Sequence, residues 1–182
     1  LLSQVQTMDH VDSVQPFVLS QVMFRSSTGV TGGIVKGIDP QYAKTTLGKT
    51  IFQGLEPLEE KLRHRTSRAN RPGLPPSIIL GGGLADQLGV IEGDPIYLVL
   101  STGGLSPVGH MPAIKRFEVT GIFEVGMHQY DAAFAYINLS EAMKVFHLEA
   151  ISGIEIQVDN IFRADRLADR IVDALGGYPY FA

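Results

Sequence analysis

The stretch SIILGGGLADQLGVIEGDPIYLVL (Ser77–Leu100) contains several structural signals in a short piece of chain. Its first apolar residues predict a short strand, and Leu84–Leu88 predicts one or two helical turns. Glu92-Gly93-Asp94 predicts a turn, because glycine adopts positive φ and the aspartate side chain bonds turn backbone. PIYLVL then predicts a second strand. The middle of the chain is therefore rich in short β elements.

Gly81-Gly82-Gly83 follows a predicted strand and opens a predicted helix, as a phosphate-binding loop does. The loop lacks the Lys-Ser/Thr pair of a P-loop, and its glycines do not have GxGxxG spacing. We interpret these glycines as a site of close backbone packing at a helix start.

Outside this stretch, apolar spacing and turn residues predict the remaining elements. Helices are expected at residues 1–11, 40–54, 55–65, 140–150 and 161–177. Strands are expected at 15–27, 29–39, 115–126, 132–139 and 151–160, and residues 68–76 form a breaker-rich linker. Ser140 is the expected N-cap of its helix. The last helix has an apolar stripe, which contains Phe162 (or Ile161), Ala164, Leu167, Ala168, Ile171 and Leu175. The fold class is α+β. We expect the two strands near the start of the chain and the strand and helix near its end to pair into one sheet, with the β-rich middle of the chain inserted between them.

Composition is that of a folded protein: 45% of the 182 residues are hydrophobic and 19% are charged. No apolar run approaches the roughly 18–20 residues of a membrane span. Residues 61–71 hold five of the fifteen Lys/Arg and no acid, and the rest of the chain has a net charge of −9. Because that basic segment has no aromatic residue for base stacking, we expect no nucleic-acid partner. The chain begins without methionine or a signal peptide, which suggests a piece or processed product of a longer protein.

The residues that could carry chemistry do not form a known catalytic or metal-binding motif. The chain has no cysteine, and its five histidines show no HxxxH or HExxH spacing, so no metal site is expected. His128, Tyr130 and Asp131 lie close together in MHQYD and are the best general acid–base candidates. Polar residues are common in such a turn, and we predict that the chain is not an enzyme and needs no cofactor.

LSTGGLSPVGHMPAIKRF (Leu100–Phe117) is an unusual loop, because it keeps four apolar side chains between two predicted strands. Loops usually lie on the surface in contact with water. The apolar residues are Leu105, Val108, Met111 and Ile114.

Several motifs in order resemble one family over nearly the whole chain from about Val30. They are VKGIDP, IILGxxLAxxLGVxxGD, GIFxxGMxxYD, YIxLxxA and SGIEIxVDNxxxA. This set is similar to the periplasmic domain of LolC/LolE-type lipoprotein-releasing ABC transporter permeases, within the MacB/FtsX-like family and nearer to the LolC type.

The resemblance implies a porter-like α/β subdomain and an inserted β-rich, Sabre-like subdomain with a protruding β-hairpin, the Hook. The expected division is 1–45 with 152–182 for the porter-like part and 46–151 for the Sabre-like part, including a Hook at 101–115. The whole protein would lie in the inner membrane of a Gram-negative bacterium and release lipoproteins. Its expected partners are a LolA-type carrier, a LolD-type ATPase subunit that hydrolyses ATP, and an identical or paralogous permease.

The resemblance also implies that the Hook recruits the carrier. The family pattern Ser/Thr-Pro-x-Gly-x-x-Pro matches Ser106–Pro112, followed by basic residues and Phe117. Two positions differ: His110 stands where a basic residue is common, and Ile114 stands where polar residues assist docking. The implied carrier-binding residues are Pro107, Val108, Gly109, His110, Met111, Pro112, Lys115 and Arg116. Val108 and Met111 are the expected docking tip, with Leu105 and Ile114 in the stem.

Two other functions remain open from the sequence. A permease of the same architecture could serve tripartite efflux or cell-wall hydrolase control, and would then not bind the carrier. An enzyme centred on His128, Tyr130 and Asp131 would need a polar cleft around these side chains.

Overall fold

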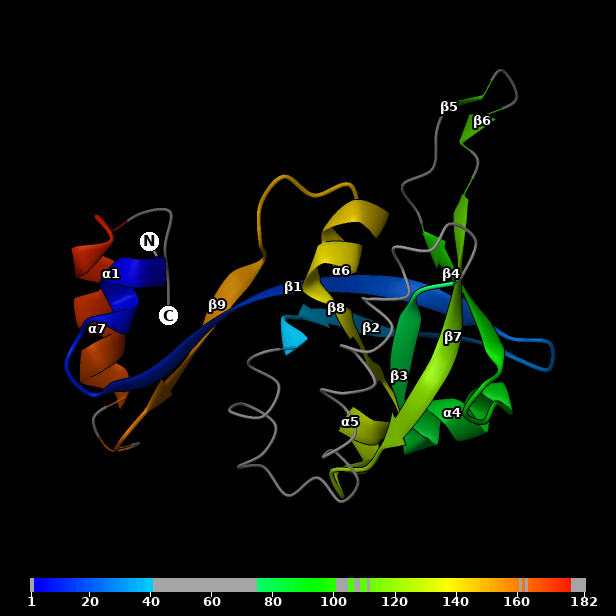
Figure 1. Cartoon of the computed structure of the whole chain (residues 1–182), viewed down its shortest axis with the longest axis horizontal. Helices are drawn as coiled ribbons and strands as arrows, with labels where there is room; N and C mark the ends of the chain where they lie inside the picture. Colours follow the sequence, from blue (N-terminus) through cyan, green and yellow to red (C-terminus); the bar gives the residue numbers. More distant parts are fainter. Residues whose placement is uncertain are drawn as a thin grey trace. The chain divides into compact units, whose positions relative to one another are not determined.

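The computed structural model describes residues 2–40, 75–100, 105–106, 109–110, 112–160, 162 and 164–177. The chain divides into two compact units. The larger is Phe17–Ser152, and the smaller joins Leu1–Pro16 to Gly153–Ala182. Figure 1 shows the elements along the chain.

The larger unit is built on a mixed sheet that closes on itself. Its strands are β1 (Val11–Arg25, shared with the smaller unit), β2 (Val30–Ile38), β3 (Ser77–Gly81), β4 (Pro95–Leu100), β7 (Ala113–Phe123) and β8 (Phe134–Asn138). β1 pairs antiparallel with both β2 and β4. From β2 the ring continues through β8, β3 and β7 back to β4. The β2–β8 and β3–β7 pairings are parallel, and the others are antiparallel.

The main core lies between the inward side chains of these strands and two short helices, α4 (Gly82–Leu88) and α6 (Leu139–Val145). α4 packs against β2, β3 and β7, and α6 packs against β2 and β8. Each fully buried Leu, Ile or Phe contributes about 1.5–3 kcal/mol of hydrophobic stabilisation. The strand residues of this core include Val18, Val22, Phe24, Ile78, Leu80, Ile96, Leu98, Phe117, Val119 and Ile137.

The opening stretch of the sequence folds as predicted, with its strand, helix, turn and second strand. The helix begins two residues earlier than expected, at Gly82, and its C-cap is Gly89, which has a φ of 60°. In the turn, Gly93 has a φ of 98°, and the Asp94 carboxylate accepts a hydrogen bond from the Ile91 amide at 2.9 Å.

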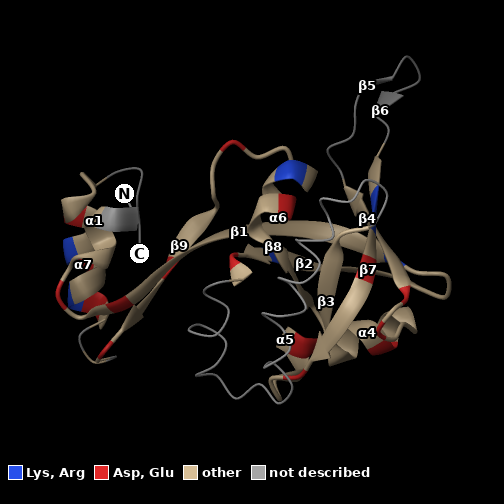
Figure 2. Ribbon diagram, viewed as in Figure 1, with Lys and Arg blue, Asp and Glu red and all other residues tan. Residues whose placement is uncertain are grey.

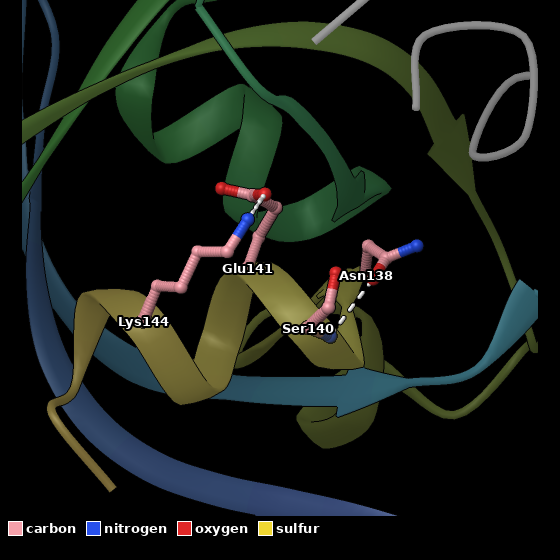
Figure 3. Close-up of polar contacts among 4 residues, drawn as sticks. All are labelled: Asn138, Ser140, Glu141 and Lys144. Atoms are coloured by element: carbon pink, nitrogen blue, oxygen red, sulfur yellow. Dashed lines mark hydrogen bonds and ion pairs between the residues drawn. The ribbon is translucent and has the colours of Figure 1, made fainter. Parts of the chain in front are cut away.

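The N-cap of α6 is Asn138 rather than the predicted Ser140. The Asn138 side chain accepts a hydrogen bond from the backbone N–H of Ser140 at 2.8 Å, and from its hydroxyl (Figure 3). Lys144 bonds Glu141 one turn along the same helix at 2.9 Å. The prediction was wrong by two residues because Asn and Ser are both strong N-cap residues and both lie at this boundary.

The smaller unit contains α1 (Leu2–Gln6), the first part of β1, β9 (Gly153–Val158) and α7 (Ala164–Ala174). β9 lies next to β1 in the strand order. A second core joins Val5, Val14, Leu167 and Ile171, with the alternating residues of β9 packed against it. Phe162 does not belong to the apolar stripe predicted for the last helix. It is 96% exposed and precedes α7.

The observed units differ from the predicted division at their first boundary, which lies after Pro16 rather than after residue 45. Because β2 pairs with both β1 and β8, the first hairpin belongs to the larger unit. The predicted helices at 40–54 and 55–65, and most of the linker at 68–76, lie outside the described residues, as does the basic segment 61–71.

Candidate partner interface

The chain between β4 and β7 contains a second, two-stranded sheet. β5 (Leu105–Ser106) pairs antiparallel with β6 (Gly109–His110). Leu105 pairs with His110, and Ser106 pairs with Gly109. Figure 1 shows β5 and β6 beyond the ends of β4 and β7. The apolar loop of the sequence therefore includes a hairpin that extends from the closed sheet.

The predicted interface residues fall into three groups. Gly109 and His110 lie in β6. Pro107, Val108 and Met111 lie outside the described residues. Pro112, Lys115 and Arg116 are exposed on the chain that returns from the hairpin. The pairing of Ser106 with Gly109 leaves only Pro107 and Val108 to connect β5 with β6.

The stem of the hairpin is the β4–β7 pair, and its register assigns Lys115 and Arg116 to different faces. Lys115 lies opposite Leu98, and Arg116 lies opposite Tyr97. Directly opposite residues in an antiparallel pair have side chains on the same face. Leu98 is fully buried, whereas Tyr97 is only partly buried. Arg116 therefore belongs to the outward face of the stem, whereas Lys115 lies on the same face as Leu98, with its own residue exposed.

The sequence reasoning missed two residues on that outward face, Tyr97 and Val99. Val99 lies opposite Ile114, which is 53% exposed. The structure distinguishes the two faces of β4, because Ile96, Leu98 and Leu100 are buried and the residues between them are only partly buried. From the sequence, PIYLVL predicts only a strand, because an unbroken apolar run does not identify which residues face outward.

His128, Tyr130 and Asp131 do not converge on one point. Asp131 is buried, and its carboxylate accepts hydrogen bonds from the amides of Val125 at 2.8 Å and Gly126 at 3.2 Å. The Tyr130 hydroxyl bonds the Tyr136 hydroxyl, and His128 is exposed. The described geometry gives Asp131 a structural role in the turn before α5 (His128–Asp131).

Charged side chains are spread over the described part of both units, as Figure 2 shows. Among the described residues, no group of three or more His, Asp or Glu side chains is placed to hold a metal ion. In the same part of the chain, no helix has the length and apolar character needed to cross a membrane.

Comparison with known families gives a match to the model for the MacB-like periplasmic core domain, over residues 1–174. Among curated proteins, the chain is similar to the lipoprotein-releasing system transmembrane protein LolC of Xylella fastidiosa strain Temecula1. Identity is 34% over 123 residues, which cover 68% of this chain and 29% of that protein. LolC of Neisseria meningitidis serogroup B is 24% identical over 158 residues, covering 86% of this chain and 36% of that protein. The chain thus spans about a third of the length of these relatives.

Two solved structures share the fold. The extracellular domain of the noncanonic ABC-type transporter YknZ from Gram-positive bacteria has a TM-score of 0.59 at 16% identity, covering 97% of this chain and 82% of that one. The periplasmic region of MacB from Actinobacillus actinomycetemcomitans has a TM-score of 0.56 at 12% identity, covering 97% and 73%. These identities are low, so the likeness shows the α+β fold alone.

Proposed function

The chain belongs to the family of MacB-like periplasmic core domains, and from that membership we propose that it serves an ABC transporter permease that releases lipoproteins. In this proposal the domain recruits a LolA-type soluble carrier through the β5–β6 hairpin. The curated relatives named as LolC support the choice of lipoprotein release over efflux or hydrolase control.

The observation that carries the proposal is the hairpin itself. It extends from the β4–β7 pair. Its sequence overlaps the stretch Ser106-Pro107-Val108-Gly109-His110-Met111-Pro112. The LolC-type resemblance associates this pattern with carrier docking. A short hairpin that continues from a strand pair suits that task, because it can reach a partner beyond the end of the sheet.

The chemistry of the hairpin is consistent with a transient complex. Its prolines fix φ and so reduce the conformational freedom lost on binding. Val108 and Met111 are the proposed apolar anchors, and Lys115 and Arg116 add charge at the base. Two or three anchors at about 1.5–3 kcal/mol each, less the cost of association, correspond to a dissociation constant in the micromolar range.

The proposal places the domain on the periplasmic side of the inner membrane of a Gram-negative bacterium. ATP hydrolysis belongs to a separate LolD-type subunit, and a second permease, identical or paralogous, completes the transporter. The domain itself uses no cofactor and catalyses no reaction.

Lipoprotein transfer by the full-length permease tests this function. Because Leu100 pairs with Ala113, a two-residue Asn-Gly turn can replace residues 101–112 without changing the strand register. In proteoliposomes that hold the permease and its ATPase, we expect this variant to hydrolyse ATP but transfer no lipoprotein to the carrier. Transfer at the wild-type rate would overturn the role of the hairpin. A wild-type permease that moves no lipoprotein would instead favour efflux or hydrolase control.

A further inference from the structure

The chain passes between its two units at two places, Pro16–Phe17 and Ser152–Gly153. On β1, Val14 belongs to the smaller core and Val18 belongs to the larger one. Pro16 lies between them on the same face of the strand, because side chains alternate along a strand, and it is only partly buried. The strand β1 thus leaves one core before it enters the other.

Pro16 also ends the pairing of β1 with β2. The register of that pair begins with Phe17 opposite Ile38. The backbone groups of Phe17 and Leu19 face away from β2, since both bond Ser152 instead. Neighbouring residues of a strand present their backbone groups to opposite edges, so Pro16 faces the β2 edge. Proline has no N–H to donate there, and β1 loses β2 as a neighbour at this point.

Ser152 bonds β1 where the chain passes back to the smaller unit. Its N–H donates to the Phe17 carbonyl at 2.9 Å. Its hydroxyl accepts a hydrogen bond from the Leu19 N–H at 2.9 Å and donates to the Leu19 carbonyl at 3.5 Å. Ser152 is exposed, so water can replace these bonds without leaving a buried group unpaired. The hydroxyl therefore makes a contact that can break and form again.

A buried amide just before the first passage opposes this contact. Gln15 is 4% exposed, and among the described residues its side-chain Nε2 has no hydrogen-bond partner. A buried donor without a partner destabilises the arrangement that buries it. Any opening that admits water to Gln15 removes this cost. The passages thus combine one contact that favours a closed arrangement with one group that favours an open one.

We propose that the two passages form a hinge, and that the Ser152 hydroxyl is the clamp that limits its opening. The hinge lets the larger unit, which carries the β5–β6 hairpin, change position relative to the smaller unit. A few exposed hydrogen bonds suit this task, because the two arrangements then differ little in free energy. This inference goes beyond the proposed function, since it requires no carrier.

Distances between spin labels, measured by double electron–electron resonance, test the hinge. The chain has no cysteine, so Asp86→Cys and Arg166→Cys together place one label on α4 and one on α7. Both residues are exposed, and they lie in different units. The control pair is Asp86→Cys with Lys144→Cys, which lies within the larger unit. We expect a broader distance distribution across the units, and one as narrow as that of the control pair would overturn the hinge.

Variants of Ser152 test the clamp. Ser152→Ala keeps the backbone bond and removes the hydroxyl, whereas Ser152→Thr keeps both. We expect Ser152→Ala to broaden the distribution across the units about twofold, and Ser152→Thr to resemble the wild type. The control pair within the larger unit should not change. No broadening in Ser152→Ala would overturn the clamp, and so would equal broadening of the control pair, because it would indicate unfolding of the larger unit.

Gln15→Met tests the group that opposes the clamp. Methionine is unbranched and needs no hydrogen bond, so it removes the cost of the closed arrangement. We expect a narrower distribution across the units and a higher midpoint of thermal unfolding. A distribution that Gln15→Met leaves unchanged would remove Gln15 from the hinge. Because no carrier is present in these measurements, the hinge can fail while the proposed function stands, and the reverse.

Discussion

Gly81 ends β3 at a point where a neighbouring backbone approaches closely. A Cβ atom on Gly81 would overlap the carbonyl oxygen of Asp131. The φ of Gly81 is −64°, so the requirement for glycine is steric rather than conformational. The close packing expected from the Gly81-Gly82-Gly83 run is thus present at its first residue.

Gly81→Ala should lower the free energy of unfolding by about 3 kcal/mol, because backbone on both sides must move. Gly32→Ala is the matched control, since its Cβ would have nothing within 4 Å. Urea unfolding of both variants measures the difference. Equal stabilities would show that the contact with Asp131 relaxes without cost.

Asp131→Ala should destabilise the protein by about 1–3 kcal/mol, because the amides of Val125 and Gly126 lose their acceptor. Asp131→Asn keeps one side-chain oxygen as an acceptor and should cost less. Thermal unfolding ranks the two variants. Two variants as stable as the wild type would remove the structural role of Asp131.

At the scale of single elements, the N-terminus of α6 gives a direct comparison of two candidate caps. Asn138→Ala should cost about 1 kcal/mol, because the Ser140 amide loses the side-chain oxygen that it bonds. Ser140→Ala should lower the free energy of unfolding by only a few tenths of a kcal/mol. Chemical denaturation of the two variants measures both changes. A larger loss for Ser140→Ala would restore serine as the functional cap.

Most described elements were predictable from local signals, and their ends were not. The strand, helix and turn of Ser77–Leu100 follow from apolar runs and from Gly93 and Asp94, which act over a few residues. The cap of α6 depends on which of two suitable residues bonds the helix N-terminus. The exposure of Phe162 depends on which of several apolar residues packs against the core. Assigning residues to the two faces of the hairpin stem required the β4–β7 strand register, and no local sequence pattern contains that register.

At the scale of the whole molecule, the two units have separate cores. Leu167 lies in the smaller core, and Leu80 lies in the larger one. Each Leu→Ala change should cost about 2–5 kcal/mol in its own core.

Hydrogen exchange should therefore separate the units. Leu167→Ala should speed amide exchange in α1 and α7 and leave β3, β7 and β8 protected, whereas Leu80→Ala should expose those three strands. Faster exchange throughout the chain in Leu167→Ala would show that the two cores unfold as one.

The closure of the sheet is the part of the fold that was not predicted from the sequence. It depends on β1 pairing with both β2 and β4, and the β1–β4 pairing covers only Met23–Arg25. The β1–β4 contacts join residues more than seventy positions apart, so they leave no trace in local periodicity. The candidate interface was found from its apolar loop and the resemblance, whereas the outward position of Tyr97 and Val99 on its stem came only from the register.

The proposed function depends above all on the recruitment of a soluble lipoprotein carrier by the hairpin between β4 and β7. Calorimetric titration of the LolA-type carrier into this chain, and into the variant with Asn-Gly in place of residues 101–112, tests it most directly. We expect a dissociation constant in the micromolar range for the intact chain and no detectable binding for the variant. Equal affinity for both chains, or no binding to the intact chain, would contradict it.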